Sequence, residues 1–253
     1  MKIATWNVNS LKVRLPQVLE WLSAQRPDVL CLQELKMEDK AFPAEELRQA
    51  GYHATFSGQK TYNGVAILSL QPPQSPLAGI PRFDDPQKRL IAATVDGVRI
   101  VSAYFPNGQA VGSDKFAYKL RWIAALTGFI EEELARHSRL VLTGDFNIAP
   151  EDRDVHPDWK ESILVSPPER TAFNTLLQTG LVDAFRLFDQ PERSFSWWDY
   201  RMNAFKRNFG LRIDHLLLSK ALSGFCRQCT VDPTPRAWER PSDHAPVMAV
   251  IAA

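Results

Sequence analysis

Cysteine is scarce in this chain, and long apolar runs are missing. Only three cysteines occur among 253 residues, an odd number that does not suit a disulfide framework and is typical of a reducing compartment. No run approaches the roughly 20 apolar residues of a membrane-spanning helix, and the first residues turn polar too early for a signal peptide. These absences predict a soluble, cytoplasmic protein with no membrane partner.

Two of the cysteines, Cys226 and Cys229, form a Cys-x-x-Cys pair. A structural zinc would need two more ligands at matching spacing, and a redox pair would need the helix start of a thioredoxin-like unit. Neither feature is visible, so we interpret the pair as structural. Cys31 lies inside an apolar run and is expected in the core.

A large excess of charge is also lacking. The formal net charge is +1 at pH 7, which argues against a protein that coats nucleic acid by charge alone, because such binding rests on many Lys and Arg contacts. The local balance is less even. Residues 201–240 carry eight Lys or Arg against three Asp or Glu, which is compatible with a basic rim for a polyanion.

Short β-like runs alternate with helical ones along the whole chain. The predicted strands are 2–7, 28–33, 64–70, 89–95, 98–104, 139–145, 194–198, 211–218 and 246–252. The predicted helices are 14–25, 113–136 and 168–179, and residues 71–88 and 149–166 are predicted loops. Since no Gly- or Ser-rich linker interrupts this pattern, we expect one α/β domain over 1–253, with two packed mixed sheets covered by helices.

Oxygen and imidazole side chains follow several of these apolar runs. Asp145 and Asn147 come two residues apart after a buried strand, so both point to the same side and can handle a proton and a phosphoryl oxygen. Glu34 ends another strand and is the natural ligand for a hard divalent cation, with Asn7 as a turn residue or a neighbour of the metal. Convergence of such groups from several segments predicts a metal-dependent phosphodiesterase.

A histidine adds to this set. His244 follows Asp243 just before the last strand, and Asp214 is placed at the previous one. An acid that accepts a hydrogen bond from one imidazole nitrogen fixes the tautomer and favours the cation, which can then interact with a phosphate or a water.

The segment 195–201 is unusually aromatic and leads into a stretch that contains Lys206, Arg207 and Arg212. Aromatic rings among cations suit stacking against nucleotides with phosphate contacts beside them. About half of these rings are nevertheless expected in the core.

In this order, the motifs resemble those of the exonuclease III family of abasic-site DNA endonucleases, within the endonuclease/exonuclease/phosphatase superfamily. The resemblance extends from Lys2 to about Val250. Its most specific parts are Trp6-Asn7-Val8-Asn9-Ser10-Leu11, Leu32-Gln33-Glu34, Gly64-Val65-Ala66-Ile67-Leu68, Gly144-Asp145-Phe146-Asn147, Gly210-Leu211-Arg212-Ile213-Asp214 and Ser242-Asp243-His244-Ala245-Pro246.

The resemblance implies a DNase I-like four-layer α/β sandwich with the active site at one end. It implies Mg²⁺ or Mn²⁺ as cofactor, held in a region formed by Asn7, Glu34, Asp145, Asn147, Asp243 and His244. The implied catalytic residues are Tyr104, Asp145, Asn147, Asp214 and His244, with Asp214 orienting the imidazole and Tyr104 contacting the scissile phosphate. Whether Asp145 or His244 acts as the general base stays open.

The family's substrate is duplex DNA with abasic sites or with damaged or recessed 3′ ends, and we expect a monomer that serves base excision repair as an endonuclease, an exonuclease or both. The matching DNA contacts are Asn9, Lys12, Lys36, Tyr62, Trp197, Arg201, Leu211 and Ile213. Of these, Trp197, Leu211 and Ile213 match positions that line the pocket for the flipped-out sugar.

Two departures from the family pattern leave the substrate open. Gln109 stands where some members carry an Arg that enters the duplex, and residues 151–166 lack a matching phosphate-holding Asn. The balance between internal incision and 3′-end trimming is therefore undecided. A phosphatase or phosphodiesterase of the same superfamily that acts on a non-DNA ester is the alternative, and a DNA-binding module without catalysis is a weaker one.

Overall fold

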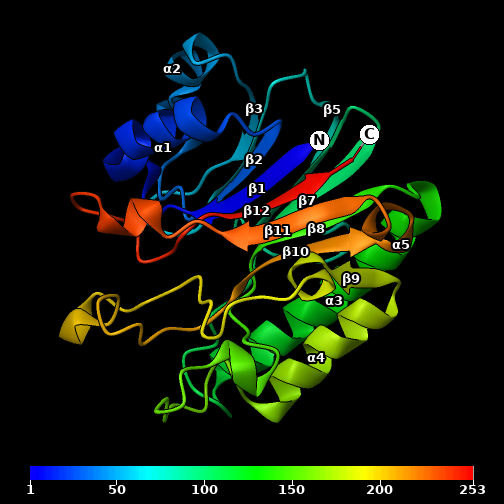
Figure 1. Ribbon diagram of the computed structural model, residues 1–253. Coiled ribbons are helices and arrows are strands. Elements are labelled where there is room, and N and C mark those ends of the chain that lie inside the picture. The colour runs from blue at the N-terminus through cyan, green and yellow to red at the C-terminus, as the bar shows by residue number, and fades with distance from the viewer. Residues whose placement is uncertain (253) are drawn as a thin grey trace.

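The computed structural model describes residues 1–252 and has two six-stranded sheets packed face to face (Figure 1). The first sheet has the order β11-β12-β1-β2-β4-β3. Its strands are β1 (Lys2–Asn7), β2 (Val29–Gln33), β3 (His53–Ser57), β4 (Val65–Ser69), β11 (Cys226–Val231) and β12 (Val247–Ile251). The pair β1 and β2 is parallel and the other pairs are antiparallel.

The second sheet has the order β5-β6-β7-β8-β10-β9. Its strands are β5 (Gln74–Ala78), β6 (Leu90–Val95), β7 (Val98–Tyr104), β8 (Leu140–Asp145), β9 (Leu181–Asp183) and β10 (Asp214–Ser219). Only β7 and β8 are parallel. Both sheets are thus mixed, as predicted.

Helices cover the outer faces of the two sheets. They are α1 (Leu11–Gln25) and α2 (Ala44–Gln49) on the first sheet, and α3 (Asp114–Arg136) and α4 (Pro167–Gln178) on the second. The short α5 (Lys220–Ser223) instead packs its Leu222 into the apolar layer between the sheets. The predicted four-layer α/β sandwich is confirmed. No helix within residues 1–252 is both long and apolar enough to cross a membrane.

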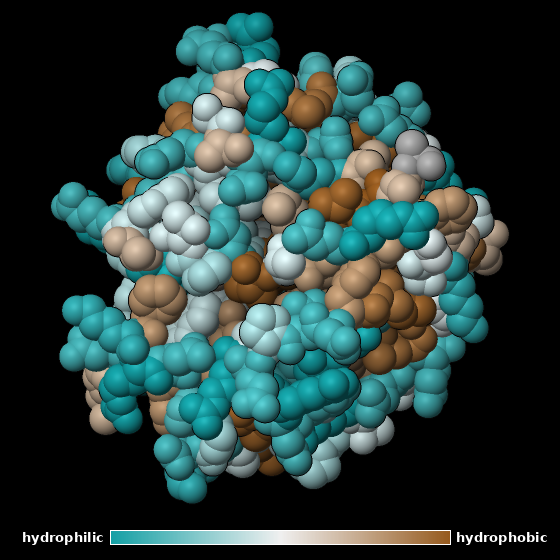
Figure 2. All heavy atoms as spheres, viewed as in Figure 1, coloured by the Kyte–Doolittle hydropathy of each residue, from teal (hydrophilic) through white to brown (hydrophobic). Residues whose placement is uncertain are grey.

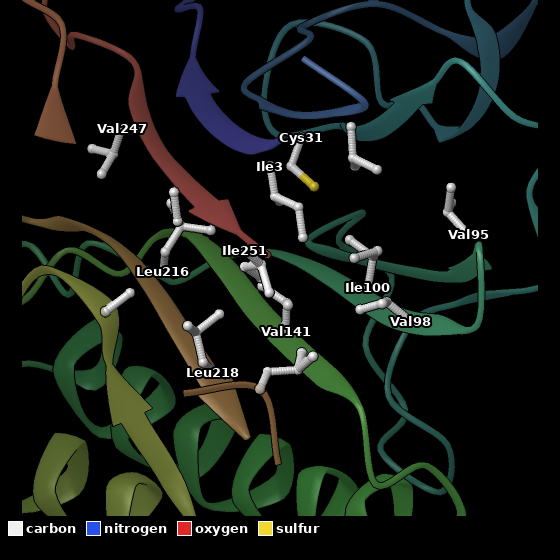
Figure 3. Close-up of a cluster of buried hydrophobic side chains, with 14 of the residues drawn as sticks. Ile3, Cys31, Val95, Val98, Ile100, Val141, Leu216, Leu218, Val247 and Ile251 are labelled. Carbon is white, nitrogen blue, oxygen red and sulfur yellow. The ribbon is translucent and has the colours of Figure 1, made fainter. Parts of the chain in front are cut away.

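The apolar core lies in three layers, one between the sheets and one under each helical layer. Figure 3 shows the middle layer, where Ile3 and Cys31 of the first sheet meet Ile100, Val141 and Leu218 of the second. With so much of the apolar side-chain area inside, polar residues cover most of the visible surface and apolar ones show only in patches (Figure 2).

Strand periodicity determines which polar groups enter the space between the sheets. Side chains alternate between the two faces of a strand. Because Ile3 and Val141 face the middle layer, so do Asn7 on β1 and Asp145 on β8, each four residues later at its strand end. Asp214 pairs with Asp145 across β10 and β8, at the same end of the sandwich. The middle layer therefore changes from apolar to polar at this end.

Several predicted boundaries differ from the structure. The predicted strand 194–198 is wrong, since only Trp197 makes isolated bridges and its neighbours Phe195 and Trp198 pack into a small separate core instead. The predicted loop 71–88 contains β5, an edge strand whose polar, exposed residues lack the apolar signal of a strand. The strands β3, β9 and β11 and the helix α2 were not predicted, and β10 begins at Asp214 rather than at 211.

The cysteine interpretation agrees with the structure. Cys31, Cys226 and Cys229 are all buried and free, and the last two lie on β11 within the middle apolar layer. Burial raises the pKa of the Cys229 thiol well above its usual value, which disfavours the reactive thiolate.

Arg212 is in the interior, which corrects its assignment to a DNA-facing basic segment. Only 1% of its side chain is exposed, and its guanidinium donates to Asp154 at 2.6 Å and to Asp183 at 2.8 Å. His215 completes this cluster: its Nδ1 lies 3.0 Å from the guanidinium and its Nε2 lies 2.9 Å from the Ile148 carbonyl. The neutral tautomer with the proton on Nε2 satisfies both contacts.

This cluster predicts an acid-sensitive fold. Burial and the neighbouring Arg212 lower the pKa of His215 from 6.5 to about 4. Between about pH 6.5 and pH 4, this histidine is therefore protonated in the unfolded chain but neutral in the folded chain. As the pH decreases through this range, the free energy of unfolding falls by about 3 kcal/mol. In urea unfolding from pH 7 to pH 4, His215→Asn should lose less stability than the parent by about this amount. The exposed His53→Asn should follow the parent, and parallel pH profiles for parent and His215→Asn would contradict the prediction.

Candidate active site

A cavity of about 610 Å³ opens at the polar end of the sandwich. The loop segments 195–210 and 232–244 project from this end of the sheets, on the left of Figure 1. Six of the predicted metal or catalytic residues line the cavity together: Glu34, Tyr104, Asp145, Asn147, Asp243 and His244. They come from both sheets, so the cavity exists only because the sheets pack face to face.

Glu34, Asp145 and His244 bring one ligand atom each to within 4.8 Å of the others. The amide nitrogen of Asn7 lies between the two carboxylates and donates to Glu34 Oε1 and Asp145 Oδ2, both at 2.9 Å. Glu34 itself adopts φ +54°, an unusual backbone conformation for a non-glycine residue that is often found at functional sites. Two carboxylates at this spacing fit a hard divalent cation such as Mg²⁺.

His244 is oriented by Asp214, as the sequence predicts. Its Nδ1 lies 2.9 Å from Asp214 Oδ2, and its Nε2 points toward Asp145 Oδ2 at 3.7 Å. Asp214 in turn accepts a hydrogen bond from the Ser196 hydroxyl at 2.6 Å. Burial alone would lower the pKa of His244, but the carboxylates of Asp214 and Asp145 outweigh it and raise this pKa to about 10. The imidazole is therefore a cation near neutral pH.

The surroundings of Asp145 favour the protonated, neutral form of its carboxyl group. Burial raises its pKa from 3.8 to about 7, against the lowering effect of His244. One of its oxygens accepts from the Asn147 backbone at 2.9 Å. Because a group that titrates near neutral pH can both accept and release a proton there, Asp145 has the proton affinity of a general base.

Tyr104 lies at the end of β7 and pairs with Asp145 on the adjacent strand β8. The Arg89 guanidinium lies 4.9 Å from the centre of its ring. Burial and the nearby carboxylates of Glu34 and Asp145 raise the pKa of Tyr104 well above its usual value. The phenol thus keeps its proton and can donate a hydrogen bond into the cavity.

Asn147 adopts φ +50° directly after β8. Its Nδ2 donates to the Phe105 carbonyl at 3.1 Å, and its Oδ1 accepts from Asn107 Nδ2 at 3.2 Å. Within residues 1–252, each of these two amides keeps one N–H without a protein acceptor. Both asparagines line the cavity, where such donors can bind phosphoryl oxygens.

Asp243 lines the same cavity but lies outside the group of Glu34, Asp145 and His244. Its carboxylate accepts from Asn9 Nδ2 and from Trp197 Nε1, both at 3.0 Å. Through these bonds, Asp243 connects the loop after β1 to the 195–210 segment. Asn7 is beside the group, but its Oδ1 accepts from the Asn9 backbone, which leaves it better suited to orienting the carboxylates than to direct ligation.

The predicted DNA contacts fall into three sets. Trp197, Arg201 and Ile213 line the cavity, together with the exposed Arg207. Asn9, Lys12, Lys36 and Tyr62 lie outside it, with Lys12 and Tyr62 exposed and Lys36 paired with Glu34 at 2.9 Å. Leu211 is fully buried in a small core and does not line the cavity, so its predicted sugar contact is not supported.

Three further residues of the site were missed from the sequence. For Asn107, the sequence Pro106-Asn107-Gly108 indicates only a turn. Ser196 holds Asp214 from a segment that was predicted as a strand, and serine at such a position carries no sequence signal. Trp159 lines the cavity from the predicted loop 149–166, with its buried indole N–H unpaired within the described residues.

The model of the endonuclease/exonuclease/phosphatase family matches residues 4–244. The chain belongs to this family. Among curated relatives of this family member, exodeoxyribonuclease III of Haemophilus influenzae is 36% identical and the exodeoxyribonuclease of Bacillus subtilis 33% identical, each aligned over 98% or more of both chains. The sequence-based expectation of a nuclease of the exonuclease III type is confirmed.

Solved structures of this family show the same architecture. A 3′ phosphatase from Neisseria bound to a product DNA hairpin is 51% identical with a TM-score of 0.98, over all of both chains. An AP endonuclease from Archaeoglobus fulgidus is 38% identical with a TM-score of 0.96, again over all of both chains. The predicted DNase I-like sandwich is thereby confirmed along the whole chain.

Metal binding by this family member should depend on Glu34. We expect Glu34→Gln to lower the affinity for Mn²⁺ by at least about tenfold, because one of two carboxylates is lost from the site. Calorimetric titration with MnCl₂ measures this. Glu38→Gln, four residues along and exposed, is the matched control and should bind like the parent. Equal affinities of Glu34→Gln and the control would rule out Glu34 as a ligand.

Proposed function

We propose that this protein is a Mg²⁺-dependent DNA repair phosphodiesterase that hydrolyses DNA at abasic sites, trims 3′ ends, or does both. The observation that supports it most is one cavity that combines the Glu34, Asp145 and His244 group with an aromatic and basic wall. Relatives aligned over the whole of this chain support the same function, among them a DNA repair nuclease of Danio rerio that is 34% identical and covered over 82% of its own length.

Glu34 would hold Mg²⁺ or Mn²⁺, with the Asn7 amide keeping its carboxylate beside that of Asp145. When bound, such an ion supplies positive charge that offsets the negative charge on the phosphoryl oxygens. Asn147 and Tyr104 donate hydrogen bonds to the same oxygens, which stabilises the charge that develops as water attacks phosphorus in line.

Asp145 and His244 have different roles in proton transfer because their proton affinities differ. Asp145 takes the proton of the attacking water, because its proton affinity lies near neutral pH. His244, held by Asp214 as the imidazolium, stays charged and donates to a phosphoryl oxygen. This assigns Asp145 as the general base and His244 as an electrostatic and hydrogen-bonding partner.

The outer wall of the cavity favours DNA over a small polar ester. Trp159, Trp197 and Ile213 form part of its apolar surface, and Arg207 supplies charge next to them, while the guanidinium of Arg201 is paired with Asp199 at 2.6 Å. An apolar pocket suits a sugar without a base, while the Arg207 guanidinium suits a phosphate beside it. A phosphatase for soluble polar substrates would need more hydrogen-bonding groups in this wall.

Several broader expectations belong to the same proposal. A single catalytic domain over 1–253 is supported by the apolar layer that both sheets share. A reducing, cytoplasmic location is supported by three free, buried cysteines. We also propose that the protein acts as a monomer, since the cavity is built from one chain.

The central experiment is Asp145→Asn, assayed for cleavage of duplex DNA with saturating MgCl₂. We expect the rate to fall by about 10²-fold or more, as is usual when a general base is lost, with DNA affinity nearly unchanged. Asp96→Asn, in the exposed turn between β6 and β7, is the control. EDTA should stop the parent. Cleavage by Asp145→Asn at the parent's rate would refute the proposed mechanism.

The substrate class requires a second comparison. Initial rates of the parent on an internal abasic analogue and on a 3′-phosphate end, at equal enzyme and Mg²⁺, separate incision from 3′-end trimming. We expect cleavage of at least one of the two. Hydrolysis of a soluble inositol phosphate without cleavage of either DNA would instead favour the alternative phosphatase.

A further inference from the structure

Lys119 is a lysine without exposed surface, located on α3 behind the active-site cavity. Its ammonium group donates to the carbonyl of Asn147 at 2.7 Å and to the carbonyl of Asn107 at 3.1 Å. The carboxylate of Glu169, equally buried, is its third partner. The ammonium thus uses its three donors on three different segments of the chain.

We propose that Lys119 is a positioning residue, whose ammonium holds the backbones of Asn107 and Asn147 so that their side-chain amides bind the phosphoryl oxygens. The inference rests on the proposed phosphodiesterase function. Lys119 does not line the cavity, so it acts through the two asparagines and not by contact with DNA.

The two asparagines need such a link because they lie on separate loops. Asn107 follows β7 and Asn147 follows β8, and one side-chain hydrogen bond of 3.2 Å joins them directly. Asn147 also adopts φ +50°, a conformation that asparagine enters more readily than other non-glycine residues. A cation bonded to the Asn147 carbonyl restrains the loop in this conformation.

Glu169 extends the arrangement to a third loop. Its carboxylate accepts from the Leu164 backbone at 3.1 Å and from the Ser166 backbone at 3.0 Å. Leu164 and its neighbour Ile163 line the cavity. The Lys119–Glu169 pair therefore connects three loops around the site, and each carries a residue that faces the substrate space.

The chain approaches the lysine closely, which indicates a specific fit. At Gly108, φ is +91°, and a Cβ atom there would lie 3.0 Å from Lys119 Cδ and 3.3 Å from Ile163 Cδ1. A larger residue there would press on the lysine side chain and would be strained at this φ. The planar guanidinium of an arginine could not replace the compact ammonium group in this space.

The test uses a double variant, Lys119→Met/Glu169→Gln, because removal of the lysine alone would leave a buried carboxylate unpaired and destabilise the fold. The matched control is Arg99→Met/Glu133→Gln. This pair also involves α3, is buried to 4% and 3% exposure, and has an N–O distance of 2.5 Å. It joins the start of β7 to the far end of the helix, away from the cavity.

Single-turnover cleavage of a duplex with a 3′-phosphate or an internal abasic analogue, at saturating enzyme and MgCl₂, gives the first readout. We expect the Lys119 variant to lose about tenfold or more in rate, because misplaced oxygen-binding groups cost transition-state stabilisation. Its DNA dissociation constant should change by less than about threefold, since the aromatic and basic wall is intact. The control should keep the parent's rate, and an equal rate loss in both variants overturns the inference.

Hydrogen exchange gives a readout that does not depend on cleavage. The backbone amide of Gln109 donates to Asn107 Oδ1 and that of Ala149 donates to the Leu164 carbonyl, so both should exchange faster in the Lys119 variant than in the control. If the parent cleaves DNA normally and the Lys119 variant shows the parent's exchange and cleavage rate, the inference is overturned while the proposed function stands. A parent that leaves both DNA substrates intact overturns the proposed function, and with it the phosphate-binding role assigned here.

Discussion

The side-chain amide of Asn7 joins the two sheets at the active site. Asn7 ends a strand of the first sheet, and its two N–H groups bind Glu34 at the end of the next strand and Asp145 on the second sheet. A buried and a half-buried carboxylate repel each other and lose hydration, so they need a shared donor to stay close. This amide makes the acidic group possible, and the cavity, the metal site and the histidine are arranged around it.

Behind this contact, a few buried polar side chains form hydrogen bonds between the sheets. Gln33 bonds to Thr5 on its own sheet at 2.9 Å and to Ser102 on the other at 3.3 Å. The Gln33 amide nitrogen thus donates within its own sheet and across to the other sheet. The same logic applies to Ser196, which accepts two backbone N–H groups and donates to Asp214. Rigid strands thus provide the positions, and buried hydrogen bonds select the orientations.

Much of the fold was predictable because strands and amphipathic helices carry periodic apolar signals. The long helix α3 begins and ends where its pattern and the N-cap Ser113 indicate. The misses have physical reasons. The edge strand β5 begins with Gln74, Ser75 and Pro76, and only its Leu77 packs against the core, so its apolar signal is weak. The aromatic run at 195–198 satisfies its hydrophobicity by packing in a separate small core, not by pairing in a sheet.

For the site, the sequence by itself determined which groups take part. Motif order and residue type identify Glu34, Asp145 and His244, because few residues other than carboxylates and imidazoles bind cations or move protons at neutral pH. The tertiary structure decided their environments. It buries Arg212 in an ion cluster and directs Asp243 to Trp197 and not to the metal group. Burial, charge and distance between segments far apart in the chain set these outcomes, and they exist only once the two sheets have packed.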